Sequence, residues 1–315
     1  MLKNNSYHLN FIYLLFSFLL SGCVSMNNYS KPDIINEKGG YYFKTIDNIN
    51  LFIYDYQPIE NYTSTIFFIS GITGINHDAE KDIIELLSNK KNRIVVIHPR
   101  GTAFSEGKRG DISDIKLFIN DYREIIMKDT DYLTNKHPIF LYGHSMSTSV
   151  LMAVAIDLKN IDGAILINPP YLQKAAKGMS PTFGQYIKYA SYMLFAKHKP
   201  IVNMAGNPSL IENESDRQES EQRLNDTLLV KYFSMYYMNE TRKLLNSMID
   251  YAKKADFPLL LIYGLKDPIV DKKGCDLIFE NWKNPDKTYC IIENSSHGKS
   301  TVLEAKNIIL EWIEE

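Results

Sequence analysis

Short apolar runs alternate with segments of helical hydrophobic spacing along most of the chain. Continuous apolar runs are typical of strands covered on both faces, and a helical pattern between two of them is typical of a crossover helix. The alternation therefore predicts an α/β fold with a mostly parallel, doubly wound sheet. The predicted buried strands span residues 65–70, 93–97, 138–142, 164–167, 258–263 and 288–292. The predicted helices between or after them span residues 79–89, 112–132, 146–158 and 299–313.

Two regions depart from this rhythm. Residues 41–45 and 51–56 are separated by Asp47-Asn48, and this arrangement predicts a hairpin. From residue 171 to about 254 no buried strand is evident, and Tyr, Met, Lys and Glu are frequent. Helices are expected there over residues 185–196 and 227–238, so we interpret this region as a helical insertion.

One pentapeptide, Gly143-His144-Ser145-Met146-Ser147, joins a predicted strand to a predicted helix. A serine on such a turn, with small residues two positions before and after it, is typical of a nucleophile elbow. Small flanking residues allow the strand and helix to pass closely, and the helix N-terminus offers free N–H groups to an oxyanion. Ser145 is therefore the candidate nucleophile.

A serine nucleophile needs a base and an acid that orients the base. Asp267 and His297 each follow a predicted strand after the insertion, which gives the chain order Ser, Asp, His found in α/β-hydrolases. The carboxyl ends of parallel strands meet at the edge where open α/β sheets place their ligand sites. Asp271 is a rival acid, but we expect it to cap the following helix.

The oxyanion of the tetrahedral intermediate needs two N–H donors. We expect them to be the backbone N–H groups of Met146, directly after the nucleophile, and of Ile72, in the glycine-bearing loop after the 65–70 strand.

Four motifs together resemble the serine hydrolases that group monoacylglycerol lipases, lysophospholipases and S33-type aminopeptidases. The resemblance covers roughly residues 40–314. The motifs are Ser70-Gly71-Ile72, the RGTAFSEGKRG loop at 100–110, Gly143-His144-Ser145-Met146, and GLKDPIVD at 264–271. It implies an α/β-hydrolase fold with a core of residues 40–171 and 251–315 and a helical cap of residues 172–250. It also implies a serine ester hydrolase that needs neither a metal nor an organic cofactor.

Five positions depart from the family pattern without removing a proposed catalytic side chain. Ser70 stands in place of a histidine, His98 in place of an aspartate, and Ala103 in place of a glycine. Ser147 and Thr148 replace the paired glycines after the nucleophile.

The amino terminus reads as a targeting segment. The apolar run 11–20 is shorter than the roughly 20 residues needed to span a bilayer, and it matches the core of a secretory signal. Leu20-Ser21-Gly22-Cys23 resembles the lipobox of bacterial lipoproteins, so we expect residues 1–22 to be a signal peptide and Cys23 to carry lipid. An ordinary signal peptide is the alternative. Residues 23–39 would form a lipidated tether to a membrane of the bacterial cell envelope, on its periplasmic or surface side.

Composition excludes several classes of protein. The 35 basic and 37 acidic residues give a net charge of −2, which provides no footprint for nucleic acid. Apart from Cys23, the chain has two cysteines, Cys275 and Cys290, and their spacing is not that of metal ligands. A disulfide between them is possible, but nothing in the sequence requires it. The oligomeric state is left open.

These features predict a membrane-anchored serine hydrolase that cleaves esters of monoacyl lipids, such as monoacylglycerol or lysophospholipid. Aromatic and aliphatic residues of the insertion would suit an acyl chain, although at helical spacing they also suit a cap core. The alternatives are a short-chain carboxylesterase, an S33-type aminopeptidase and a non-catalytic surface lipoprotein. An aminopeptidase would need an acidic group to bind the substrate amine, and the acidic residues of the insertion look like a solvated face. These are Glu212, Glu214, Glu219 and Glu221.

Overall fold

The computed structural model describes residues 40–315 except 58–60, 76, 79, 175–182 and 205–213. The predicted signal peptide, Cys23 and the tether lie outside these residues, as does Glu212. Within the described part of the chain, eight strands form one sheet in the order β1-β2-β4-β3-β5-β6-β9-β10. Their bounds are β1 Gly40–Lys44, β2 Asn50–Tyr56, β3 Ser64–Ile69, β4 Asn92–Ile97, β5 Ile139–His144, β6 Gly163–Ile167, β9 Leu259–Gly264 and β10 Lys287–Ile292.

The direction of the strands follows the predicted pattern. β1 and β2 form an antiparallel hairpin, and β2 pairs antiparallel with β4. The other neighbours from β4 to β10 pair in parallel, so the mostly parallel sheet is confirmed. Parallel strands aligned this way bring their carboxyl ends to one edge of the sheet.

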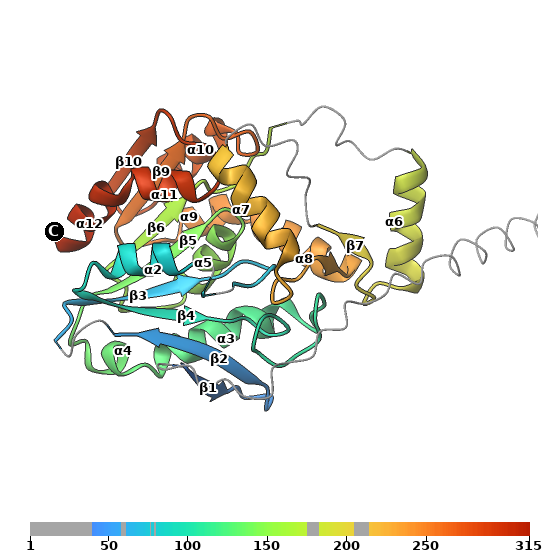
Figure 1. Ribbon diagram of the computed structural model, residues 1–315, viewed down its shortest axis with the longest axis horizontal. Coiled ribbons are helices and arrows are strands. Elements are labelled where there is room, and N and C mark those ends of the chain that lie inside the picture. The colour runs from blue at the N-terminus through green and yellow to red at the C-terminus, as the bar shows by residue number, and fades with distance from the viewer. Residues whose placement is uncertain (1–39, 58–60, 76, 79, 175–182, 205–213) are drawn as a thin grey trace, which may run out of the picture. The chain divides into compact units, whose positions relative to one another are not determined.

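Helices cover both faces of this sheet (Figure 1). The helices of the core region are α2 Lys81–Ser88, α3 Ile115–Met127, α4 Thr130–Thr134, α5 Ser147–Ala155, α10 Lys272–Asn281, α11 Lys299–Glu304 and α12 Lys306–Glu314. Apolar residues of α2, α11 and α12 pack on one face, while those of α3, α5 and α10 pack on the other. Consecutive residues of each central strand feed alternate faces, which is why these strands read as continuous apolar runs.

Two predicted helices are interrupted. The predicted helix 112–132 divides into α3 and α4 because the Asp129 carboxylate accepts the Asp131 N–H at 3.0 Å and starts a new helix. The final helix 299–313 divides at Ala305 into α11 and α12. The second break leaves apolar residues of both α11 and α12 on one face of the sheet.

The insertion lies between β6 and β9. Its elements are α6 Phe183–Phe195, β7 Val202–Asn203, α7 Glu214–Asn225, β8 Tyr232–Phe233, α8 Met235–Asn246 and α9 Met248–Ala252. None of the described helices combines the length and apolar content needed to cross a bilayer. The division into a core and a cap at residues 172 and 250 stays a prediction.

The predicted helix 227–238 is wrong in its first half. Residues before Ser234 are not helical because their backbone bonds to loops of the core instead. Val230 N–H donates to the Thr73 carbonyl at 3.1 Å, and the Leu228 carbonyl accepts the Ala103 N–H at 3.3 Å. Ser234 then caps α8 by accepting the Tyr237 N–H at 3.0 Å. The insertion is thereby attached to the loop that carries Ile72.

Candidate active site

Ser145 occupies a sharp turn between β5 and α5. Its φ is +54°, a left-handed conformation that is uncommon for a residue with a side chain. Its N–H donates to the Ile167 carbonyl at 2.8 Å, which ties the turn to β6. A Cβ on Gly143 would lie 3.1 Å from both Leu151 Cδ1 and Ser147 Oγ, so the close passage of strand and helix favours glycine there.

The departures after the nucleophile are explained by three consecutive hydroxyl groups. The side chains of Ser147, Thr148 and Ser149 donate to the carbonyls three residues earlier, at 2.8, 2.6 and 2.8 Å. Ser147 Oγ also accepts the His144 N–H at 2.7 Å. These hydroxyls bind the elbow to the first helical turn of α5. The family has glycines at two of these positions, 147 and 148.

The structure brings the three predicted side chains into one line. Ser145 Oγ lies 2.8 Å from His297 Nε2, and His297 Nδ1 lies 2.6 Å from Asp267 Oδ2. In this arrangement the serine hydroxyl donates to one ring nitrogen while the other ring N–H donates to the carboxylate. The geometry is that of a nucleophile, a base and an orienting acid.

Asp267 is fully buried and nevertheless suited to the ionised state. Its Oδ1 accepts the N–H groups of Ile269 and Val270 at 2.7 and 2.8 Å. Burial raises the pKa of this carboxyl, but the hydrogen bond from His297, the charge of that ring and the two N–H groups outweigh it and lower the pKa below its usual value. The rival Asp271 caps α10 by accepting the Lys273 N–H at 3.0 Å, as predicted.

Two residues that the sequence did not single out hold the loop that carries His297. His144 Nε2 donates to the His297 carbonyl at 2.5 Å. Burial, and then the neighbouring His297, lower the pKa of His144 to about 3, so its ring is neutral and keeps this donor. Asn168 Nδ2 donates to the Ser296 carbonyl at 3.2 Å, and its Oδ1 accepts the Gly264 N–H at 2.8 Å. Asn168 thus joins the loop to the end of β9.

The loop after β3 lies against the start of α5. A Cβ on Gly71 would lie 3.4 Å from the Ser147 backbone nitrogen, so the Ile72 loop and the elbow are neighbours. Among the described residues, the N–H groups of Ile72 and Met146 have no hydrogen-bond acceptor. Ser70, which replaces the family histidine, donates to the Ile97 carbonyl at 2.6 Å and its own carbonyl accepts the Tyr122 hydroxyl at 2.9 Å. These bonds fix the start of the loop.

The departures at His98 and Ala103 lie in a loop supported by buried polar contacts. His98 Nε2 is 3.1 Å from His77 Nδ1, and burial followed by the His77 charge lowers the His98 pKa. Arg100 pairs with Asp121 at 2.6 Å and with Asp47 at 2.9 Å. Ala103, where the family has glycine, adopts a φ of +39°.

The remaining question is whether the cysteines form a disulfide or, with other side chains, a metal site. Cys275 and Cys290 are free thiols, the first buried and the second half-buried. No group of three or more His, Cys, Asp or Glu side chains among the described residues could hold a metal ion.

The family model described as serine aminopeptidase, S33, matches residues 63–300, which is more than half of the 315 residues. The chain belongs to this family. The match includes the oxyanion loop, the elbow, the acid loop and His297, so the resemblance inferred from four motifs is confirmed.

Curated relatives and solved structures agree with this assignment. Monoglyceride lipase of Rattus norvegicus is 24% identical over 273 residues, which cover 84% of this chain and 82% of the relative. The Homo sapiens monoglyceride lipase is 23% identical with the same coverage. A soluble variant of the Saccharomyces cerevisiae monoglyceride lipase superposes with a TM-score of 0.73 at 16% identity, over 91% of this chain and 98% of that chain. Monoacylglycerol lipase of Paleococcus ferrophilus gives 0.63 at 20% identity, over 84% and 98%.

These likenesses confirm the α/β-hydrolase fold. Together with the family match, they identify the chain as a serine hydrolase.

Proposed function

We propose that this chain is a serine ester hydrolase that cleaves monoacyl lipids through an acyl-enzyme. The observation that carries the proposal is the line of hydrogen-bonded groups from Asp267 through His297 to the hydroxyl of Ser145, at 2.6 and 2.8 Å. This line sits at the carboxyl edge of the sheet, where α/β folds bind ligands.

The chemistry follows from these positions. Ser145 Oγ attacks the ester carbonyl carbon while His297 Nε2 takes the hydroxyl proton. The carbonyl oxygen becomes an oxyanion, which the N–H groups of Ile72 and Met146 stabilise, each worth about 2.7–4 kcal/mol in comparable sites. His297 then gives its proton to the departing alcohol oxygen, leaving the acyl group on Ser145. Water repeats the attack with the same base, releases the fatty acid and restores the serine.

The ionised Asp267 holds the imidazole in the tautomer that accepts the serine proton. It also stabilises the imidazolium formed in each step. Its lowered pKa keeps it charged across the working range of such an enzyme.

A lipid substrate is supported by the relatives and by the insertion. The matched relatives are monoglyceride lipases over most of their length. Helix α6 of the insertion exposes large apolar side chains, with Ile187, Leu194 and Phe195 at 52%, 76% and 70% exposure. Phe233 and Tyr237 of the insertion are instead buried, in the core that joins α8 to α3.

The amide alternative finds less support in the charges of the insertion. Recognition of a substrate amine needs an acidic group whose carboxylate is not already engaged. Glu214 is exposed and pairs with Gln218 at 2.8 Å and with Arg217. Glu219 accepts the Lys299 N–H at 3.0 Å and pairs with Arg223. Glu221 is exposed, as expected for a solvated face. Ester hydrolysis is therefore the better proposal.

We further propose that lipid on Cys23 anchors the enzyme in the bacterial cell envelope. The support is the lipobox-like Leu20-Ser21-Gly22-Cys23 after a short apolar run. Several acyl chains at about 0.8 kcal/mol per buried CH2 would hold the protein beside a lipid substrate.

Hydrolysis rates on a small panel of substrates test the proposal. The panel is a long-chain monoacylglycerol, a lysophospholipid, a short acyl ester and a proline-terminated amide, each with the mature chain and with Ser145→Ala. The expected result is preference for the long-chain esters, abolished in the variant. Hydrolysis of the amide alone would overturn the proposal in favour of a peptidase, and preference for the short ester would remove the lipid part of it.

A further inference from the structure

The loop that carries His297 is held from two directions. On the core side, His144 and Asn168 donate to the carbonyls of His297 and Ser296. On the other side, the Lys299 N–H donates to Glu219 Oε2 at 3.0 Å. Glu219 belongs to α7, in the insertion, some eighty positions earlier in the chain. The backbone directly after His297 is thus bonded to the insertion as well as to the sheet.

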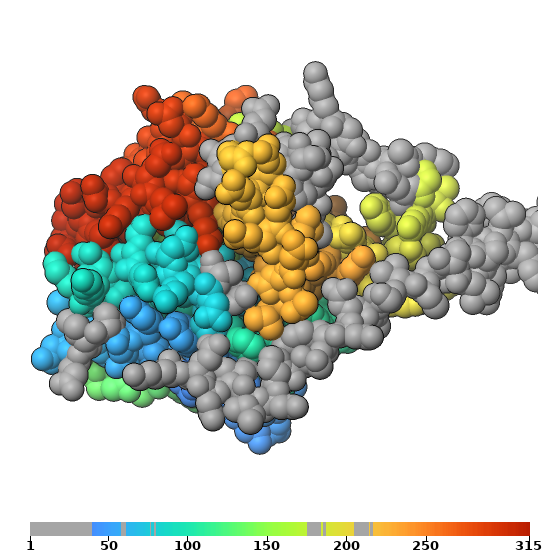
Figure 2. Space-filling model, in the orientation of Figure 1, coloured from blue at the N-terminus to red at the C-terminus, as the bar shows by residue number. Residues whose placement is uncertain are grey.

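Figure 2 shows where this contact lies. Helix α7, in gold, rests beside the red C-terminal segment that contains α11 and beside the cyan segment of α2. The contact is therefore at the seam between the insertion and the hydrolase core.

A small ion cluster surrounds the contact. Glu219 pairs with Arg223 at 3.3 Å, and Arg223 reaches Glu80 at 3.5 Å. The Lys299 ammonium lies 3.5 Å from Glu80 and 2.9 Å from Asp82. The Glu219 side chain is only 18% exposed, so the expectation that it lies on a solvated face is wrong. Partly buried pairs of this kind are screened less by salt than surface pairs.

The local sequence explains why the Lys299 N–H takes an acceptor from another element. The residue before it is Gly298, which has no side chain to accept the N–H groups that open α11. Glycine also leaves the backbone at this point freer than any other residue would. The Glu219 carboxylate therefore restrains the backbone directly after the proposed catalytic base.

We infer that Glu219 is a positioning residue, through which the insertion sets the place of the catalytic base. The inference rests on the proposed function, because it takes His297 as that base. When α7 is seated on the core, the Lys299 backbone is fixed and Nε2 of His297 is held toward Ser145. When α7 moves away, the loop loses that restraint. The insertion then does more than cover the substrate, since its position also determines whether the base is aligned.

The kinetic test compares two substitutions of Glu219 with a matched control on the same helix. Glu219→Ala removes the acceptor. Glu219→Gln keeps an amide oxygen for the Lys299 N–H, but it removes the charge and replaces the oxygen that faces Arg223 with an NH2 group. Glu221→Ala alters an exposed residue of α7. We expect kcat on the preferred ester to fall by about tenfold or more in Glu219→Ala with KM nearly unchanged, because misplacement of a catalytic group affects the chemical step. Glu219→Gln should recover most of this loss, and Glu221→Ala should match the unaltered chain.

An activity-independent measurement accompanies it. In the Ser145→Ala background, amide hydrogen exchange of the segment around Lys299 should be faster with Glu219→Ala and near normal with Glu219→Gln. This measurement still decides whether Glu219 holds the loop if the protein fails to hydrolyse any ester, a failure that would count against the proposed function instead.

The inference is overturned by any of three results. The first is an unchanged kcat in Glu219→Ala, and the second is a rise in KM alone, which would make α7 only a substrate cover. The third is equal impairment by Ala and Gln, which would assign the effect to the charge of Glu219 rather than to its bond with the Lys299 backbone.

Discussion

At the scale of single residues, the candidate nucleophile has a strained backbone and lies beside three side-chain hydrogen bonds. A non-glycine residue at positive φ costs on the order of 1–3 kcal/mol, and Ser145 holds a φ of +54°. The hydroxyls of Ser147, Thr148 and Ser149 each bond a carbonyl three residues earlier, and such bonds contribute about 1 kcal/mol apiece. These bonds fasten the elbow to the start of α5, two of them from positions where the family has glycines.

Asn168 gives a prediction at the same scale. It is fully buried at a φ of +46°, and its side chain bonds both the Ser296 carbonyl and the Gly264 N–H. Asn168→Gly tolerates the backbone angle but leaves those groups unpaired. We expect the free energy of unfolding in urea to fall by about 1–3 kcal/mol, with a lower kcat because the His297 loop is loosened. An unchanged midpoint and an unchanged kcat would contradict this role.

Sequence reasoning located the three hydrogen-bonded residues of the candidate site but not the residues that hold them in place. Ser145, Asp267 and His297 each follow an apolar strand and have the side chain that a catalytic triad needs. Their positions and their residue types therefore indicate the same site. Asn168 stands before Pro169-Pro170, where an asparagine reads as an ordinary turn residue. His144 fits the variable position of the elbow motif. Their partners lie 96 to 153 positions away, and no local pattern records such a contact.

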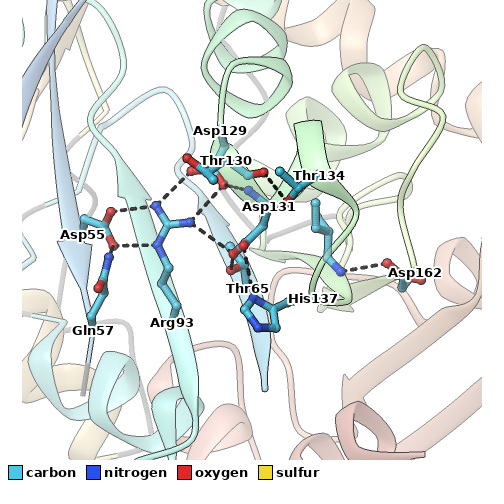
Figure 3. A network of polar contacts seen from close by, with 11 residues as sticks. Asp55, Gln57, Thr65, Arg93, Asp129, Thr130, Asp131, Thr134, His137 and Asp162 are labelled. Carbon is cyan, nitrogen blue, oxygen red and sulfur yellow. Dashed lines mark hydrogen bonds and ion pairs between the residues drawn. The ribbon is translucent and has the colours of Figure 1, made fainter. Parts of the chain in front are cut away.

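At the scale of secondary-structure elements, a buried ion network joins β2, β4 and the start of α4 (Figure 3). Arg93 bonds Asp55 at 2.9 and 2.7 Å and Asp129 at 2.9 Å through both amino groups. Asp131, nearby, accepts from Thr65 and His137 at 2.5 and 3.1 Å. Arg93 and Thr65 stand near the starts of their strands, so this network lies at the edge opposite the site.

Removal of Arg93 should therefore affect stability and spare catalysis. Arg93→Met leaves buried carboxylates without their cation, which costs about 3–5 kcal/mol. The exposed pair Lys91–Glu314 is the matched control, since Lys91→Ala should cost no more than about 1 kcal/mol. Thermal unfolding measures both. A similar loss from the two changes, or a fall in kcat of the folded Arg93→Met protein, would refute this view of the network.

The seam between α7 and the core predicts a pH dependence of stability. Burial raises the pKa of Glu80 from 4.5 to about 7. The positive charges of Arg223 and Lys299 lower this pKa, and the negative charges of Glu219 and Asp82 raise it. The folded state thus keeps this proton to higher pH than the unfolded state does. The protonated Glu80 carboxyl therefore contributes its full stabilisation below pH 4.5. As the pH rises to about 7 this stabilisation is lost, and the free energy of unfolding falls by about 3 kcal/mol at most.

Glu80→Gln cannot titrate, so its free energy of unfolding should lack this fall between pH 4.5 and 7. Denaturant unfolding at several pH values measures the difference between the two proteins. Parallel curves for both would show that Glu80 does not titrate in this range.

Two of the three departures from the predicted helices share one cause. Residues 112–132 and 227–238 both have helical spacing, yet tertiary contacts decide where each helix begins. Asp129 caps a new helix within the first segment, and the backbone around Val230 bonds the Thr73 loop in the second. Periodicity reports which positions face the core, but it does not report where a backbone finds its hydrogen bonds.

At the scale of the whole molecule, the topology explains why distant residues meet. β5, β6, β9 and β10 are parallel neighbours, so the residues that follow their ends converge although they are up to 153 positions apart. This convergence was predictable, because it depends only on strand order and direction. The attachment of the insertion through Val230, Ser234 and Glu219 was not, since it depends on contacts between elements of no regular pairing.

Lipidation at Cys23 is tested with a protein that includes residues 1–22. With Cys23→Ala, expressed in a bacterium, we expect the protein to leave the membrane fraction and to lose incorporation of a fatty-acid analogue, because no cysteine remains at the cleavage position. Fractionation and labelling of the two proteins side by side measure this. Equal membrane recovery and labelling would contradict lipidation at Cys23.

The most direct test of the central claim is covalent labelling by a fluorophosphonate, with the modified peptide located by mass spectrometry. The label should lie on Ser145, be absent from Ser145→Ala and form far more slowly in His297→Ala, since the hydroxyl reacts only when the base takes its proton. Retained labelling in Ser145→Ala, or none in the unaltered protein, would contradict the assignment of Ser145 as the nucleophile.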